Sequence, residues 1–110
     1  MKTIATAIIG LTLCASAQAE FLTGNDLLSR LQSSDVAIRM TGLGYVMGVF
    51  DASQGAAHCA PNDAGITAGQ VRDITTLWLE RNPAQRHETA DRLVVNMLSQ
   101  LWPCQRRNSL

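Results

Sequence analysis

The sequence is short and electrically balanced, which limits what it can form and bind. It has 110 residues, with nine Lys and Arg against nine Asp and Glu, and this length fits a single domain. The charged side chains form no basic stripe and no run of like charge, which argues against nucleic acid as a partner.

Residues 1–19 have the features of a secretory signal peptide. Lys2 gives a short positive start, an apolar run follows over residues 4–15, and Ala17-Gln18-Ala19 resembles a cleavage site. The run of about 12 apolar residues is too short for a membrane anchor, which needs ~20. We therefore expect export, a mature domain over residues 20–104 and a loose tail over residues 105–110, with no membrane contact after cleavage.

Removal of the leader, which carries Cys14, leaves Cys59 and Cys104. An even count in an oxidising compartment predicts one disulfide, and the loop of roughly 45 positions that it closes should gain about 4 kcal/mol of stability. Two alternatives are disfavoured. One is a nucleophilic cysteine paired with His58 or His87, and the other is a zinc site made from these four residues, whose spacing matches no known ligand pattern.

The first two helices are marked by caps. Thr23 precedes an acid at position 26 in the manner of a capping box, and a helix is predicted over residues 24–32. Ser33-Ser34-Asp35 ends it and caps a second helix, which frays over residues 54–57. Apolar residues cover two opposite faces of this second helix, a pattern typical of a central helix packed on both sides.

Small residues repeat at four-residue intervals along the second helix. They are Gly44, Gly48, Ala52 and Ala56. Such a ridge lets a neighbouring backbone come close, although each glycine costs about 1 kcal/mol of helix propensity. We expect the neighbour to be another helix of the same chain rather than a second copy.

The longest loop follows Cys59 and is rich in turn-forming residues. It consists of Ala60, Pro61, Asn62, Asp63, Ala64 and Gly65. Thr67 and Gln70 form another capping box, and a third helix is predicted to run to Arg81.

Asn82-Pro83 is predicted to end the third helix and begin the fourth, with Asn as N-cap and Pro in the first turn. The fourth helix has the clearest helical periodicity of the chain and runs to Leu101. Since no stretch alternates like a strand, the predicted fold is all-α, a compact bundle of about four helices with one disulfide after a cleaved signal peptide.

Few residues suggest catalysis. The glycines of residues 42–48 have the wrong spacing for a dinucleotide loop, and no strand precedes them. Asp51 is interpreted as a structural acid paired with Arg86 or Arg92 rather than as a general base. Arg86 and His87 are expected to make polar contacts at a helix face. We therefore expect no enzymatic activity, no cofactor and no metal.

Six segments in order resemble one protein family. They are Phe21-x-x-Gly24-Asn25-Asp26-Leu27-Leu28, Leu43-Gly44-Tyr45-Val46-x-Gly48-Val49-x-Asp51-Ala52, Cys59-x-Pro61, Thr67-x-x-Gln70-Val71-x-Asp73, Leu79-x-x-x-Pro83-x-x-Arg86-His87-x-x-Ala90 and Trp102-Pro103-Cys104. Together they resemble the Rap/Tai immunity family, periplasmic proteins linked to type VI secretion.

The resemblance implies an exported helical inhibitor that binds and blocks a peptidoglycan amidase toxin, that forms homodimers, and that has the Cys59–Cys104 disulfide. The loop over residues 60–65 is expected either to contribute to toxin binding or to be a plain connector. Binding would suit it, because a disulfide holds it and little entropy would be lost on binding. The alternative is a general envelope protein, such as a small stress-related chaperone, with no toxin partner.

Overall fold

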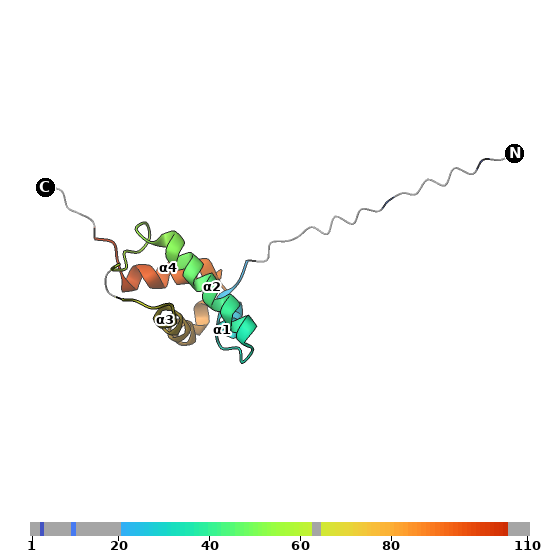
Figure 1. The fold of residues 1–110 in the computed structure, drawn as a ribbon, viewed down its shortest axis with the longest axis horizontal. Coiled ribbons are helices and arrows are strands. Elements are labelled where there is room, and N and C mark those ends of the chain that lie inside the picture. The colour runs from blue at the N-terminus through green and yellow to red at the C-terminus, as the bar shows by residue number, and fades with distance from the viewer. Residues whose placement is uncertain (1–2, 4–9, 11–20, 63–64, 106–110) are drawn as a thin grey trace.

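A computed structural model describes residues 3, 10, 21–62 and 65–105 of the chain (Figure 1). Its elements are α1 (Gly24–Leu31), α2 (Val36–Ser53), α3 (Ala68–Arg81), the short 3-10 helix η1 (Pro83–Gln85) and α4 (Ala90–Leu101). The described residues contain isolated bridges but no strand, so the all-α prediction is confirmed. Nearly all of the expected signal peptide and of the tail lie outside the described residues.

The first three helices begin at the predicted caps. The Thr23 hydroxyl accepts from the Asp26 N–H at 3.2 Å, and the Asp26 carboxylate accepts from the Thr23 N–H at 3.1 Å. This backbone donor is the main reason that the pKa of Asp26 is lowered. Asp35 caps α2, and Thr67 and Gln70 make the same reciprocal pair at the start of α3. Local sequence therefore sets these three helix starts.

The core is organised around α4. Five of its residues are buried, namely Ala90, Leu93, Val94, Met97 and Leu98. The other helices add Leu27, Leu28 and Leu31 from α1, Val46 from α2, and Val71 and Leu79 from α3. In Figure 1, α2 crosses in front of α4, and the two helices are in contact.

The prediction that α2 is buried on both faces was wrong, although α2 contacts each of the other three helices. Val36 and Met40 are 61% and 54% exposed, and a Cβ added at Gly44 or Gly48 would meet nothing within 4 Å. The ridge of small residues therefore faces away from the other helices of the chain. Apolar residues on every face of a helix do not reveal which face is inside, and here only one side of α2 is packed.

The predicted start of the fourth helix was also wrong. After η1, the Arg86 carbonyl accepts from the Asn25 N–H and the Glu88 carbonyl accepts from the Gly24 N–H, both at 2.9 Å. Gly24 allows this approach, because a Cβ there would lie 3.0 Å from the Arg86 oxygen. Residues 86–88 thus form a turn and a bend beside the start of α1. Thr89 is extended and pairs with Thr23, and α4 begins only at Ala90.

Candidate functional site

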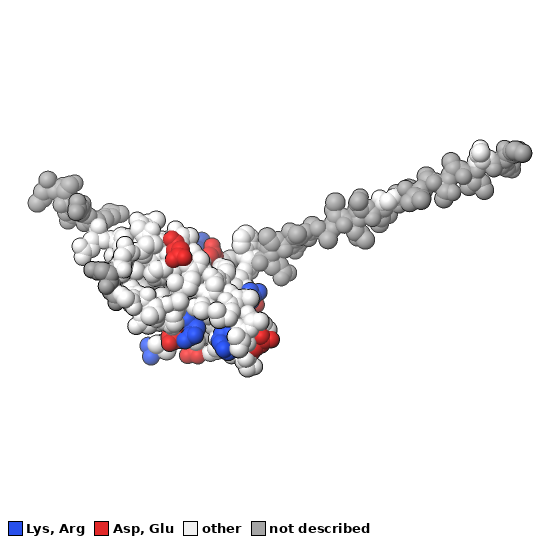
Figure 2. Space-filling model, viewed as in Figure 1, with Lys and Arg blue, Asp and Glu red and all other residues white. Residues whose placement is uncertain are grey.

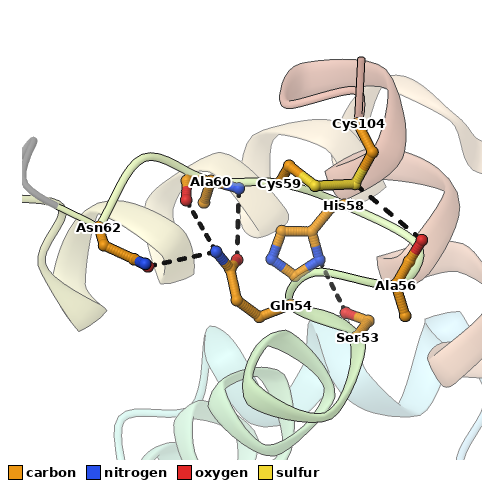
Figure 3. The surroundings of a disulfide bond; sticks show 8 residues. All are labelled: Ser53, Gln54, Ala56, His58, Cys59, Ala60, Asn62 and Cys104. Carbon is orange, nitrogen blue, oxygen red and sulfur yellow. Dashed lines mark hydrogen bonds between the residues drawn. A yellow bond between two sulfur atoms is a disulfide. The ribbon is translucent and has the colours of Figure 1, made fainter. Parts of the chain in front are cut away.

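A disulfide ties the end of α2 to the end of α4 (Figure 3). Cys59 and Cys104 are bonded, with their Cα atoms 4.8 Å apart, so the predicted pairing is confirmed. The Cys59 N–H also donates to the Trp102 carbonyl at 2.8 Å. Because both sulfur atoms are bonded to each other, neither cysteine is a free thiol, and the nucleophilic Cys–His alternative is excluded.

The side chain of Gln54 fixes the segment after the disulfide by holding the backbone of Ala60. Its amide nitrogen donates to the Ala60 carbonyl at 2.8 Å, and its oxygen accepts from the Ala60 N–H at 3.3 Å. The same nitrogen donates to the Asn62 side chain at 3.3 Å. Figure 3 shows this amide facing the Ala60 backbone. The first residues of the loop are therefore fixed twice, at Cys59 by the disulfide and at Ala60 by the Gln54 amide.

His58 lies beneath the disulfide and is fully buried. Its Nδ1 atom is 2.8 Å from the Ser53 hydroxyl, and its ring packs on Phe50 with centroids 4.7 Å apart. Burial lowers the pKa of His58, because removal from water disfavours the charged ring. The neutral ring therefore packs beneath the disulfide, at the start of the loop.

The loop over residues 60–65 is only partly exposed. Pro61, Asn62 and Gly65 are exposed, whereas Ala60 is buried. Ala60 therefore anchors the loop rather than presenting a surface to a partner. Asp63 and Ala64 lie outside the described residues.

A surface pocket of about 350 Å³ opens between α3 and the end of α4. Ile66, Ile74 and Trp102 give it apolar walls, and Gln70 and Asp73 supply polar groups. Trp102 is held edge-on against Phe50, with ring centroids 6.1 Å apart. Trp102 lines this pocket and also accepts from the Cys59 N–H, so the pocket adjoins the disulfide and the loop. We call the disulfide, the loop and the pocket together the disulfide corner.

The other residues singled out from the sequence lie elsewhere. Asp51 and His87 are exposed, and Arg86 is half-buried. Among residues 21–62 and 65–105, the one ion pair joins Arg72 to Asp73 at 3.0 Å, so the expected pairing of Asp51 with an arginine is not found there. It is the backbone of Arg86, rather than its side chain, that makes the contact between α1 and the segment before α4.

Charged side chains are unevenly spread over the described surface. On the face drawn in Figure 2, most of them lie toward the end where α1 leads into α2, and a smaller group lies near the other end of α2. The pocket contains Asp73, which is paired with Arg72. Within the described part of the chain, no group of three or more His, Cys, Asp or Glu residues could hold a metal ion, and no helix is long and apolar enough to cross a membrane.

Comparison with known proteins identifies the family. A family model described as Rap1a immunity proteins matches residues 23–104, which span all four helices and both disulfide cysteines. The chain belongs to the Rap1a immunity protein family. No curated protein matches the chain.

Membership in the Rap1a family implies an immunity protein that binds a secreted toxin. Such a family typically consists of inhibitors without an enzymatic activity of their own. The disulfide corner combines an anchored loop with an apolar pocket, which suits a protein-binding surface better than a catalytic one. The sequence located the loop and marked His58 only as a disfavoured catalytic or zinc-binding residue. It gave no sign of the buried role of His58 or of the contact that Gln54 makes, although both residues closely precede Cys59.

Proposed function

We propose that this Rap1a protein acts in the periplasm, where it binds and blocks a peptidoglycan-cleaving amidase delivered by type VI secretion. The family match over residues 23–104 carries this proposal, and the leader sequence supports the compartment. Inhibition would be steric, with the immunity protein covering the substrate groove of the toxin.

The disulfide corner is the proposed contact surface. The loop is fixed before binding by the Cys59–Cys104 bond and by the paired Gln54 amide. A pre-organised loop loses little conformational freedom when it is captured, so more of the contact energy appears as affinity. The apolar pocket beside Trp102 gives a place for one buried anchor side chain of the toxin.

A pull-down tests the proposal. Oxidised protein would serve as bait against the periplasmic and type VI secreted proteins of the same species and its relatives. Recovery of a cell-wall amidase whose activity the bait abolishes would support immunity. Recovery of no such enzyme, together with general binding of unfolded envelope proteins, would instead favour the chaperone-like alternative.

Asn62→Arg is expected to weaken inhibition of the recovered amidase by about 10- to 100-fold, because a bulky charge would enter the centre of the proposed contact. Asn96→Arg is the matched control, since Asn96 is equally exposed but lies on α4. Inhibition constants of both variants, with circular dichroism to confirm folding, provide the comparison. Equal inhibition by both variants would remove the loop from the contact surface.

The outward face of α2 is the proposed contact in a homodimer. Val36, Met40, Gly44 and Gly48 recur at four-residue intervals and lie open, so apolar side chains and small residues line one face of the helix. Small residues let two helices approach closely. This face fits the dimer that the family resemblance implies.

Gly48→Leu is expected to give a folded monomer. The substitution places a bulky group on the open face, and leucine is the better helix former by about 1 kcal/mol. Gly42→Leu is the control and should unfold the protein, because a Cβ at Gly42 would lie 3.1 Å from the Leu31 side chain. Sedimentation velocity and thermal unfolding would be measured for each. A monomeric parent protein would contradict the dimer.

A further inference from the structure

His58 places an ionisable ring inside the disulfide corner. The residue is 0% exposed, with the Ser53 hydroxyl at Nδ1 and the Phe50 ring against its plane. The ring therefore has no contact with bulk water. A proton can therefore reach the ring only if the side chains packed around it move aside.

The Ser53 hydroxyl lies 2.7 Å from the Val49 carbonyl and 2.8 Å from His58 Nδ1. We assign the hydroxyl hydrogen to the Val49 carbonyl, so that the hydroxyl accepts from Nδ1–H. In this tautomer Nε2 has a bare lone pair, which avoids a buried N–H without an acceptor. Nε2 is buried and has no hydrogen-bond partner among the described residues.

A proton bound at Nε2 would be poorly accommodated. It would create a buried positive charge whose new N–H has no acceptor, a costly state for an unpaired group. Burial is the cause of the lowered pKa of His58, and no charged side chain contributes. The ionisable residues described on the packed helices are Arg39, Tyr45 and Asp51 on α2, Arg72, Asp73, Glu80 and Arg81 on α3, and Asp91 and Arg92 on α4.

The segment that holds the ring can open without leaving the domain. The Gly55 N–H donates to the His58 carbonyl at 2.7 Å, and Gly55 has a positive φ of 79°, so the chain turns back sharply between α2 and the ring. One residue further on, Cys59 is covalently tied to Cys104. An opening of this turn is therefore bounded on one side by α2 and on the other by the disulfide.

We propose that His58 makes residues 54–60 an acid-sensitive latch, in which protonation of Nε2 expels the ring and loosens the turn while the disulfide keeps it attached to α4. An expelled ring takes up a proton near pH 6.5, whereas the buried ring does so only at lower pH. The closed latch is therefore fully favoured above that pH and loses stability as the pH falls below it. Weaker toxin inhibition in acid would follow, a consequence that rests on the proposed function.

Hydrogen exchange of the oxidised protein alone tests the latch. The protected amides of Gly55 and Cys59 report on the turn, and buried amides of α4 report on the core. Between about pH 7 and about pH 5, the opening constant of the turn should rise by up to about tenfold per pH unit. At every pH the turn should open far more often than α4, whose buried amides exchange through unfolding of the whole domain. Turn protection that does not vary with pH, or that equals the protection of α4 throughout, would overturn the latch.

Two histidine variants identify the titrating group. His58→Asn keeps a donor for the Ser53 hydroxyl but cannot ionise, so its turn should open independently of pH. His87→Asn removes the exposed histidine and should behave like the parent protein. The same pH dependence in His58→Asn would refute the proposal.

Ring nitrogen chemical shifts of the parent protein decide the matter if His58→Asn does not fold. They should show the neutral Nδ1–H form and a titration midpoint below about 6.5. A midpoint at or above that value would also refute the latch. No toxin is present in these experiments, so their outcome is separate from that of the proposed function.

Discussion

Replacing Cys59 and Cys104 together by serine should lower the free energy of unfolding by about 4 kcal/mol. The disulfide joins residues 45 positions apart, and without it the unfolded chain gains the conformational freedom that this loop closure removes. Small domains have total stabilities of only about 5–15 kcal/mol, so the variant should be close to unfolding at body temperature. Urea unfolding followed by circular dichroism measures the difference.

The reduced parent protein is the control for this experiment. Adding reductant should bring the parent to the stability of the double serine variant, and it should leave the variant itself unchanged. A parent protein whose unfolding midpoint is insensitive to reductant would show that the native packing, rather than the covalent link, holds the corner closed.

Leu98→Ala should destabilise the protein by about 2–5 kcal/mol. Leu98 is fully buried in α4, where its removal leaves a cavity among the helices packed around it. Met40→Ala on the outward face of α2 should cost less than about 1 kcal/mol, because Met40 is 54% exposed and its removal leaves no cavity. Unfolding free energies of the two variants, measured at a concentration where the protein is monomeric, make the comparison.

The relative size of these two effects tests whether the outward face of α2 is open. A large loss for Met40→Ala together with a small one for Leu98→Ala would show that α2 is packed on both faces, as its apolar character first suggested.

Features set by neighbouring residues could be predicted from the sequence. The starts of α1, α2 and α3 follow from Thr23, Asp35 and Thr67, because a cap is completed within a few residues of the chain. The disulfide followed from compartment and cysteine count. These predictions needed no knowledge of how the helices pack.

Features set by tertiary contacts could not be predicted in this way. The Asn82-Pro83 pair predicted a helix start at Pro83, but the carbonyls of Arg86 and Glu88 bond instead to the start of α1. Likewise, the many apolar residues of α2 could not show which side faces the core. Gly24 and Gly42 are the positions where another part of the chain comes close, whereas Gly44 and Gly48 are open, and glycine spacing alone does not distinguish them.

The candidate site also combines features that neighbouring residues predict with features that only tertiary contacts set. The turn-forming composition after Cys59 located the loop, whereas the roles of Gln54 and His58 depend on partners that only folding brings near. Gln54 contacts the backbone of a residue six positions away, and His58 is buried by Phe50 and Ser53. Neither role has a local sequence signature.

The way in which Gln54 holds the loop has a consequence for how this protein can change over evolution. Its amide forms hydrogen bonds with the N–H and the carbonyl of Ala60. Every residue at that position except proline has both of these backbone groups. The exposed positions after Ala60 can therefore be exchanged while both bonds to Ala60 remain, and a change at Asn62 would remove only its own bond to the Gln54 amide. A protein built in this way can acquire specificity for a new toxin by varying the loop tip while its scaffold stays the same.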